Sequence, residues 1–202
     1  MRVGGVKEWF ETGMVGQKAY CDAMLATAKA LQVVNQLRDE GFISRYAIGG
    51  AIGALFYIEP TQTQDIDIFV HLNPAPGSSL ISLSPILTRL KDLGYTLWEE
   101  DKVVVEGWPI QFLPATKTME MEAIEQAIEQ PLADGVNVFV PPPEYLIIIA
   151  IDLGRPKDII RLQQFHAEGV YEAAKLDVLL AKYGLAEKWQ RYLTLFKTDK
   201  ES

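Results

Sequence analysis

Residues 46–70, YAIGGAIGALFYIEPTQTQDIDIFV, decide the fold of this 202-residue chain. The short apolar run 46–48 is typical of a buried strand, and the glycine pair Gly49-Gly50 that follows it predicts a tight turn. Residues 51–58 then suit a short helix. From residue 65 onward, apolar side chains alternate with other residues at the two-residue period of a strand. The stretch therefore predicts strand, glycine turn, helix and strand, in that order.

Two aspartates give this stretch its chemical interest. Asp65 and Asp67 lie two residues apart on the predicted strand, so both carboxylates are expected on the same face. Adjacent carboxylates repel each other, and a divalent ion such as Mg²⁺ or Mn²⁺ offsets that repulsion because it prefers oxygen ligands. Glycines at the end of the preceding strand let the backbone approach a phosphate, and the next helix presents free amide groups. The combination predicts metal-assisted phosphoryl or nucleotidyl transfer, with a plain turn and a solvated strand edge as the alternatives.

The remaining sequence predicts an α+β fold with a mixed sheet. A loosely attached lead over 1–16 precedes a domain over 17–141, and a C-terminal helical region covers 142–202. Strands that cluster in the middle of the chain argue against a regular doubly wound parallel sheet. The expected elements are helices over 17–40, 83–93 and 118–129, strands over 95–99, 103–106, 110–113 and 136–140, and consecutive helices from 144 onward, broken at Gly154, Gly169 and Gly184.

Composition excludes several classes of function. The chain has 19 basic and 27 acidic side chains, for a net charge of −8, and this acidity disfavours general DNA binding. Residues 155–202 differ, because 9 basic and 7 acidic side chains give them a net charge of +2. The longest apolar run, 145–151, is far shorter than a membrane span, and Glu8 and Glu11 fall where a signal peptide needs apolar residues. We therefore expect a soluble, cytoplasmic protein.

Three stretches carry a resemblance to a known family: YAIGGAIGALF with TQDIDIFV, then EGWPIQFLPA, then PPEYLIIIAIDLGRPKDIIRL. They span residues 46–162. The chain resembles the polymerase-β-type nucleotidyltransferase superfamily, in which two small residues open a helix and two aspartates alternate with apolar residues on the next strand. More narrowly, it is similar to bacterial proteins grouped near the abortive-infection AbiEii-type toxins. The resemblance implies a nucleotidyltransferase-like core followed by a helical bundle.

The resemblance also implies roles for individual residues. Asp65 and Asp67 correspond to metal ligands, and Gly49, Gly50 and Ala51 lie near the triphosphate.

Active superfamily members usually add a third carboxylate on a later strand, and the matching position here is Gln111. Its amide oxygen ligates weakly and cannot accept a proton from an alcohol. Glu106, the nearest upstream acid, would substitute only if a hairpin turned it inward.

A second departure concerns the C-terminal helices. AbiEii-type enzymes carry a lysine on the helix before an R-x-K-D motif, and the aligned residue here is Ala150. The motif itself is present as Arg155, Lys157 and Asp158. Arg155 and Lys157 are predicted to bind phosphate, and a structural ion pair with Asp158 is the alternative.

The leading functional hypothesis is a nucleotidyltransferase that binds an NTP with Mg²⁺ or Mn²⁺. It would transfer a nucleotidyl group to a hydroxyl of RNA, protein or a small molecule. A toxin that pairs with an antitoxin protein is compatible with this activity. The alternative is a degenerate binding or regulatory protein that kept the fold and lost the chemistry, which the neutral residues Gln111 and Ala150 favour.

Overall fold

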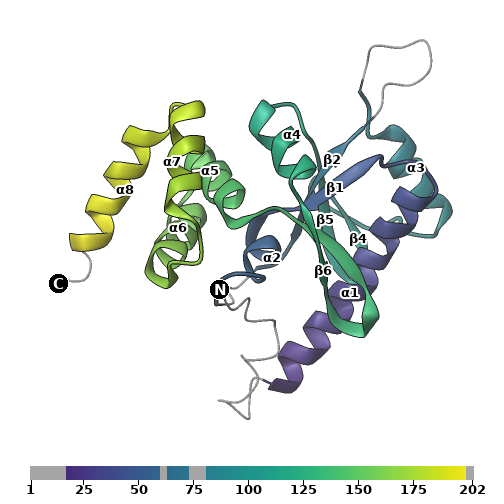
Figure 1. Cartoon of the computed structure of the whole chain (residues 1–202). Helices are drawn as coiled ribbons and strands as arrows, with labels where there is room; N and C mark the ends of the chain where they lie inside the picture. The colour runs from purple at the N-terminus through teal and green to yellow at the C-terminus, as the bar shows by residue number, and fades with distance from the viewer. Residues whose placement is uncertain (1–16, 60–62, 73–80, 199–202) are drawn as a thin grey trace.

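The computed structural model describes residues 17–59, 63–72 and 81–198, so the lead predicted for 1–16 lies outside the described residues. It has the predicted α+β character, with a mixed sheet and helices on either side (Figure 1). The strands are β1 (Arg45–Ile48), β2 (Ile66–His71), β3 (Trp98–Glu99), β4 (Lys102–Val105), β5 (Trp108–Pro114), β6 (Ile128–Pro131) and β7 (Asn137–Val140). The helices are α1 (Gln17–Asp39), α2 (Gly50–Ala54), α3 (Ser84–Asp92), α4 (Thr118–Glu125), α5 (Pro143–Leu153), α6 (Pro156–Glu168), α7 (Ala173–Lys182) and α8 (Ala186–Thr198), with a 3₁₀ turn over Ala133–Gly135.

Five strands form the main sheet in the order β1-β2-β5-β4-β3. The neighbours β2 and β5 are parallel, whereas β1 with β2, β5 with β4, and β4 with β3 are antiparallel. The antiparallel set predicted between residues 95 and 113 is thus confirmed, and β2 joins it through β5. The strands β6 and β7 form a separate two-stranded sheet.

The alternation of side chains in β2 assigns its two faces to different helices. Ile66, Ile68 and Val70 belong to an apolar cluster with residues of α1 and α3. Phe69, on the other face, belongs to a second cluster that contains residues of α4 and α5 to α8. Asp67 shares the face of Phe69 because side chains two residues apart point the same way. The candidate site therefore lies on the face that the C-terminal helices cover.

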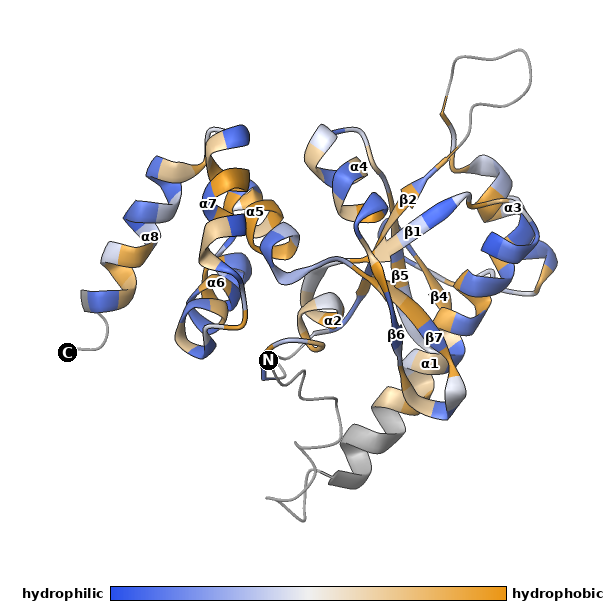
Figure 2. Ribbon diagram, viewed as in Figure 1, coloured by the Kyte–Doolittle hydropathy of each residue, from blue (hydrophilic) through white to orange (hydrophobic). Residues whose placement is uncertain are grey.

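The C-terminal helices pack around α5, which is apolar along most of its length (Figure 2). Gly154 and Gly169 adopt the left-handed conformation at the ends of α5 and α6, as expected of glycines that terminate helices. Two hydrogen bonds join the segment after α2 to the C-terminal half of the chain, one to the residue before Pro142 and one to α6. Tyr57 donates to the Pro141 carbonyl at 2.9 Å, and the Glu59 amide donates to Glu168 at 3.1 Å.

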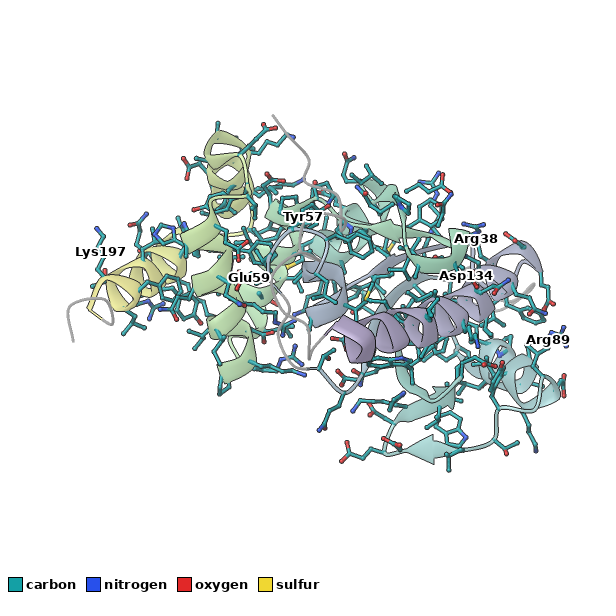
Figure 3. All side chains as sticks on the ribbon, turned by 90° about the horizontal axis from the view of Figure 1, so that it is seen from below. Arg38, Tyr57, Glu59, Arg89, Asp134 and Lys197 are labelled. Carbon is teal, nitrogen blue, oxygen red and sulfur yellow. The ribbon has the colours of Figure 1, made fainter. Side chains whose placement is uncertain are left out.

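Figure 3 shows Tyr57 and Glu59 in the middle of the molecule, with Arg89 and Lys197 towards opposite ends. The apolar cluster around α5 includes residues from before and after position 141, so the core continues across the predicted domain boundary.

Three predicted elements need correction. The strand expected over 95–99 is only the two-residue β3, Trp98–Glu99. The helix expected over 118–129 ends at Glu125, and residues 128–131 form β6, which pairs with β7. The helical pattern continues through this segment, but its backbone hydrogen-bonds to 137–140, a partner that local sequence does not reveal. The helix expected over 51–58 is the shorter α2, which ends at Ala54 and continues as turns.

Among the helices that the structure describes, none is both long enough and apolar enough to span a membrane.

The shared core predicts that the sheet and the C-terminal helices unfold together. Because one apolar cluster contains Phe69 of β2 and Trp189 of α8, loss of either part would expose the other. We expect a single transition in urea, with coincident midpoints by tryptophan fluorescence and far-ultraviolet circular dichroism. Two separated transitions would instead show that 142–202 is an independent folding unit.

Candidate functional site

The turn after β1 brings the backbone directly against Asp67. The Gly49 amide donates to the Asp67 carbonyl at 2.8 Å, which fixes the start of the turn to β2. Gly50 has a φ of +56°, in the left-handed region, and a Cβ at this position would overlap the Asp67 carboxylate. Both conditions favour glycine at position 50. Because the Gly49 amide is already used, the amides of Gly50 and Ala51 remain for a ligand at this turn.

Asp67 is a buried carboxylate without a donor. Only 8% of the residue is exposed, and no donor from the described part of the chain hydrogen-bonds to its side chain. Burial raises the pKa of Asp67, and the charge of Asp65 raises it further, whereas Lys157, Arg155 and Arg161 lower it. The Asp67 carboxylate lines two cavities and is not among the fully enclosed side-chain atoms that lack a partner in the described residues, so it is only partly desolvated. This environment, with no donor and a second carboxylate nearby, is suited to a bound cation.

Asp65, in contrast, has partners on both carboxylate oxygens. The Thr63 hydroxyl lies 3.3 Å from Oδ1, and Lys102 Nζ lies 3.3 Å from Oδ2. Lys102 begins β4, two strands away from β2 in the sheet. Sequence analysis did not identify it, because its approach to Asp65 depends on how three strands are aligned.

The structure places Gln111 directly beside Asp67. These residues are partners in the parallel pairing of β2 with β5, so their side chains lie on the same face. The Gln111 amide nitrogen donates a hydrogen bond to Asp101, in the turn between β3 and β4. Glu106 lies in the other turn, between β4 and β5, where it accepts a hydrogen bond from the Tyr95 hydroxyl at 2.7 Å. The inward turn of Glu106 considered from the sequence is therefore not what the structure shows.

The basic residues of α6 fall into two groups. Arg155 and Arg161 both bind Asp158, with distances of 2.7 Å and 2.6 Å, so the ion pair anticipated for Arg155 is present. Lys157 makes no ion pair with the residues that the structure describes, and its charge acts on Asp67. Of the cations in this motif, Lys157 is the most available to a ligand. Ala150 lies on the buried helix α5 and lines a cavity that Arg155, Asp158 and Arg161 also line.

Two cavities meet at Asp67 and Arg161. One has a volume of about 540 Å³, and polar groups that include Asp65, Lys157 and Thr63 line it together with Ala51. The other has a volume of about 320 Å³ and lies between the sheet and the helices α5 and α6, with Phe69, Leu113 and Leu146 among its lining residues. Both volumes are in the range of small-molecule sites.

The residues present are suited to a divalent cation. Within residues 17–59, 63–72 and 81–198, no three acidic, histidine or cysteine side chains gather closely enough to hold a metal by themselves. Mg²⁺ commonly uses one or two carboxylates and completes its coordination with water and substrate phosphates. Asp65 and Asp67 meet that requirement, and the unpartnered Asp67 carboxylate supports it.

Gly50→Ala tests the close approach of the turn to Asp67. The variant places an alanine in the left-handed conformation, and its Cβ would overlap the Asp67 carboxylate. Gly41 is the control, because it has a φ of +84° but nothing within 4 Å of an added Cβ. Gly41→Ala should therefore cost only the backbone term, about 1 kcal/mol. We expect Gly50→Ala to lower the free energy of unfolding by about 1–2 kcal/mol more than this control, measured in urea. Equal losses in the two variants would contradict the contact.

Asp158→Ala tests the neutralisation of the α6 arginines. Asp158 is 1% exposed and Arg161 is 6% exposed, so the variant leaves a buried guanidinium without its carboxylate. Burial lowers the pKa of Arg161, and Asp158 opposes that effect. We expect a loss of about 3–5 kcal/mol in the free energy of unfolding. Lys175→Ala, which removes an exposed ion pair with Glu172, should change it by less than about 1 kcal/mol.

Comparison with known proteins shows the fold but not a close relative. No protein family model matches the chain, and no curated protein matches it. The chain is similar to the crystal structure of an antigenic nucleotidyltransferase-like protein from Paracoccidioides brasiliensis, with a TM-score of 0.52 and 17% sequence identity over 87% of this chain and 93% of that one. The solution structure of the antibiotic-resistance factor ANT(2'')-Ia has a TM-score of 0.46 and 17% identity, covering 94% of this chain and 100% of that one. The chain thus has a nucleotidyltransferase-like fold.

Proposed function

We propose that this protein is a nucleotidyltransferase that binds an NTP with Mg²⁺ or Mn²⁺. The observation that carries the proposal is Asp67, a buried carboxylate with no described donor, held against a glycine turn and surrounded by the cations of α6. Burial and the nearby charge of Asp65 disfavour the ionised carboxylate, and a bound cation would offset both effects. A functional site commonly retains such a residue because function requires it although stability does not.

In the proposed complex, Asp65 and Asp67 hold the metal ion. The amides of Gly50 and Ala51 and the ammonium of Lys157 bind phosphate oxygens, and Arg155 adds positive charge from the same helix. Lys157 is the strongest of these candidates because it has no competing ion pair among the described residues, whereas Asp158 already occupies Arg155. This local positive charge favours a triphosphate although the whole chain carries a net charge of −8.

The reaction would join an acceptor hydroxyl oxygen to the α-phosphorus of the NTP. The bond from that phosphorus to pyrophosphate breaks, pyrophosphate leaves with the electron pair, and the hydroxyl proton passes to solvent. When bound, the divalent cation would neutralise charge on the phosphates. The two cavities that meet at Asp67 give room for a nucleotide and an acceptor on either side of it. The acceptor remains a hydroxyl of RNA, protein or a small molecule.

Asp67→Asn separates the function of this residue from its effect on the fold. We expect metal-dependent NTP binding to weaken by at least about 100-fold, because the metal loses a ligand. Stability should be unchanged or higher, because a neutral amide avoids the burial of charge and the repulsion from Asp65. Calorimetric titration of each NTP, with and without Mg²⁺, measures binding, and urea denaturation measures stability.

The exposed residue Asp92, at the end of α3, provides the control. Asp92→Asn removes one negative charge from the surface and should leave nucleotide binding unchanged. The double variant Asp65→Asn/Asp67→Asn should abolish metal-dependent binding altogether. NTP affinity that is the same in the double variant and in the unaltered protein would rule out the proposed site.

A degenerate binding protein is the second candidate, and the neutral Gln111 beside Asp67 favours it. Turnover with Mg²⁺ or Mn²⁺ and labelled NTP distinguishes the two, since a degenerate protein would bind nucleotide without releasing pyrophosphate. The narrower similarity to AbiEii-type toxins, an antitoxin partner and a cytoplasmic location stay predictions. A small transcriptional regulator encoded next to this protein would support the toxin hypothesis.

A further inference from the structure

A row of polar side chains crosses three neighbouring strands of the sheet. Asp67 on β2 is paired with Gln111 on β5, and the pairing of Val103 with Ile110 sets Lys102 on β4 beside Gln111. All three lie on the face opposite the α1 and α3 core, because their neighbours Ile68, Ile110 and Val103 belong to that core. The row therefore has an amide at its centre, at the position matched to a third carboxylate, and an ammonium group at its end.

Lys102 reaches back along this face to Asp65. Its Nζ lies 3.3 Å from Asp65 Oδ2 and 3.9 Å from Glu100 Oε2. The side chains of Lys102 and Asp65 are 21% and 17% exposed, so solvent only partly screens their attraction. Partial desolvation lowers the pKa of Lys102, but the hydrogen bond to Asp65 and the nearby acids outweigh it, and the pKa lies above its ordinary value. The side chain of Lys102 therefore ends beside an expected metal ligand.

Gln111 fits this arrangement because it is neutral. Its amide nitrogen is committed to Asp101, which leaves only its carbonyl oxygen to accept or ligate. A first divalent cation at Asp65 and Asp67 meets two carboxylates. A second would find no third carboxylate in the row and would be repelled by the ammonium of Lys102.

We propose that the site binds one divalent cation with the nucleotide and that the ammonium of Lys102 takes the place of a second. This inference rests on the proposed function. Its electrostatic basis is a difference in charge. An amide at position 111 with the ammonium of Lys102 makes the row two charges more positive than a carboxylate at position 111 alone, and two charges are what one divalent cation would add. Lys102 thus supplies fixed positive charge beside the reacting phosphate, the role that general electrostatic stabilisation requires.

The experiment counts Mn²⁺ ions bound per chain by electron paramagnetic resonance. The unaltered protein is saturated in turn with the non-hydrolysable α,β-methylene analogues of ATP, GTP, CTP and UTP. We expect one bound Mn²⁺ per chain–nucleotide complex. Lys102→Met combined with Gln111→Glu restores a third carboxylate and removes the competing cation, so this double variant should bind two.

Single variants show which part of the effect belongs to Lys102. Lys102→Met alone should still bind one Mn²⁺, but about fivefold more tightly, because the cation that competes for Asp65 is gone. Lys91→Met removes one positive charge from the exposed surface of α3 and should leave Mn²⁺ affinity unchanged.

The outcomes separate this inference from the proposed function. Two Mn²⁺ ions in the unaltered protein, or one in a folded double variant, would overturn the role of Lys102 while leaving the nucleotide site intact. No bound Mn²⁺–nucleotide, or binding that Asp65→Asn/Asp67→Asn does not weaken, would overturn the metal site itself and this inference with it. Circular dichroism checks the fold of each variant, and the count in the unaltered protein decides the question if the double variant does not fold.

Discussion

The burial of Asp67 constrains the rest of the site. Its carboxylate has no described donor, so the surrounding elements must limit the cost without neutralising it directly. The glycine turn is shaped by the same carboxylate, since a Cβ at Gly50 would overlap it. The positive charge that limits the cost comes from α6, whose cations act on Asp67 from a distance. The fold therefore leaves the Asp67 carboxylate available to a cation. A carboxylate that already had hydrogen-bond donors would be less available.

The same strand alternation builds both the core and the site. On β2, β5 and β4, one set of side chains packs against α1 and α3, and the other set includes Asp67, Gln111 and Lys102. Position in this row depends on strand register, and a shift by one residue would exchange the polar row for the apolar core. The apolar core thus fixes the alignment of the polar side chains. Asp158 has a comparable role at α6, because it forms ion pairs with Arg155 and Arg161, whereas Lys157 has no ion pair with the described residues.

Local sequence predicted what depends on local periodicity. The glycine turn, the strand with Asp67, and the helices that end at Gly154 and Gly169 all follow from spacing within one segment. Asp65 was also expected on that strand, but β2 begins at Ile66, so Asp65 immediately precedes it. The strand at 128–131 was missed because its partner at 137–140, rather than its own pattern, makes it a strand. Lys102 and Asp101 were missed for a related reason, since both meet the site only through the alignment of β4 with β5. Contacts that depend on how two strands are aligned cannot be predicted from the local pattern of a single sequence.

Gln111 and Lys102 are best understood together rather than as separate departures from a carboxylate triad. An acid at position 111 would be the nearest partner of Lys102 across the β4–β5 pair, and the ammonium would then have less reason to extend to Asp65. With an amide there, the nearest strong partner on this face is Asp65. The neutral residue and the neighbouring cation act in the same direction. Together they make this row two charges more positive than a carboxylate at position 111 alone would, which equals the charge of one divalent cation. A neutral residue at position 111 alone favours a protein without catalysis, whereas the same residue beside the ammonium of Lys102 would, under the proposed function, add positive charge where a transferring phosphate needs it.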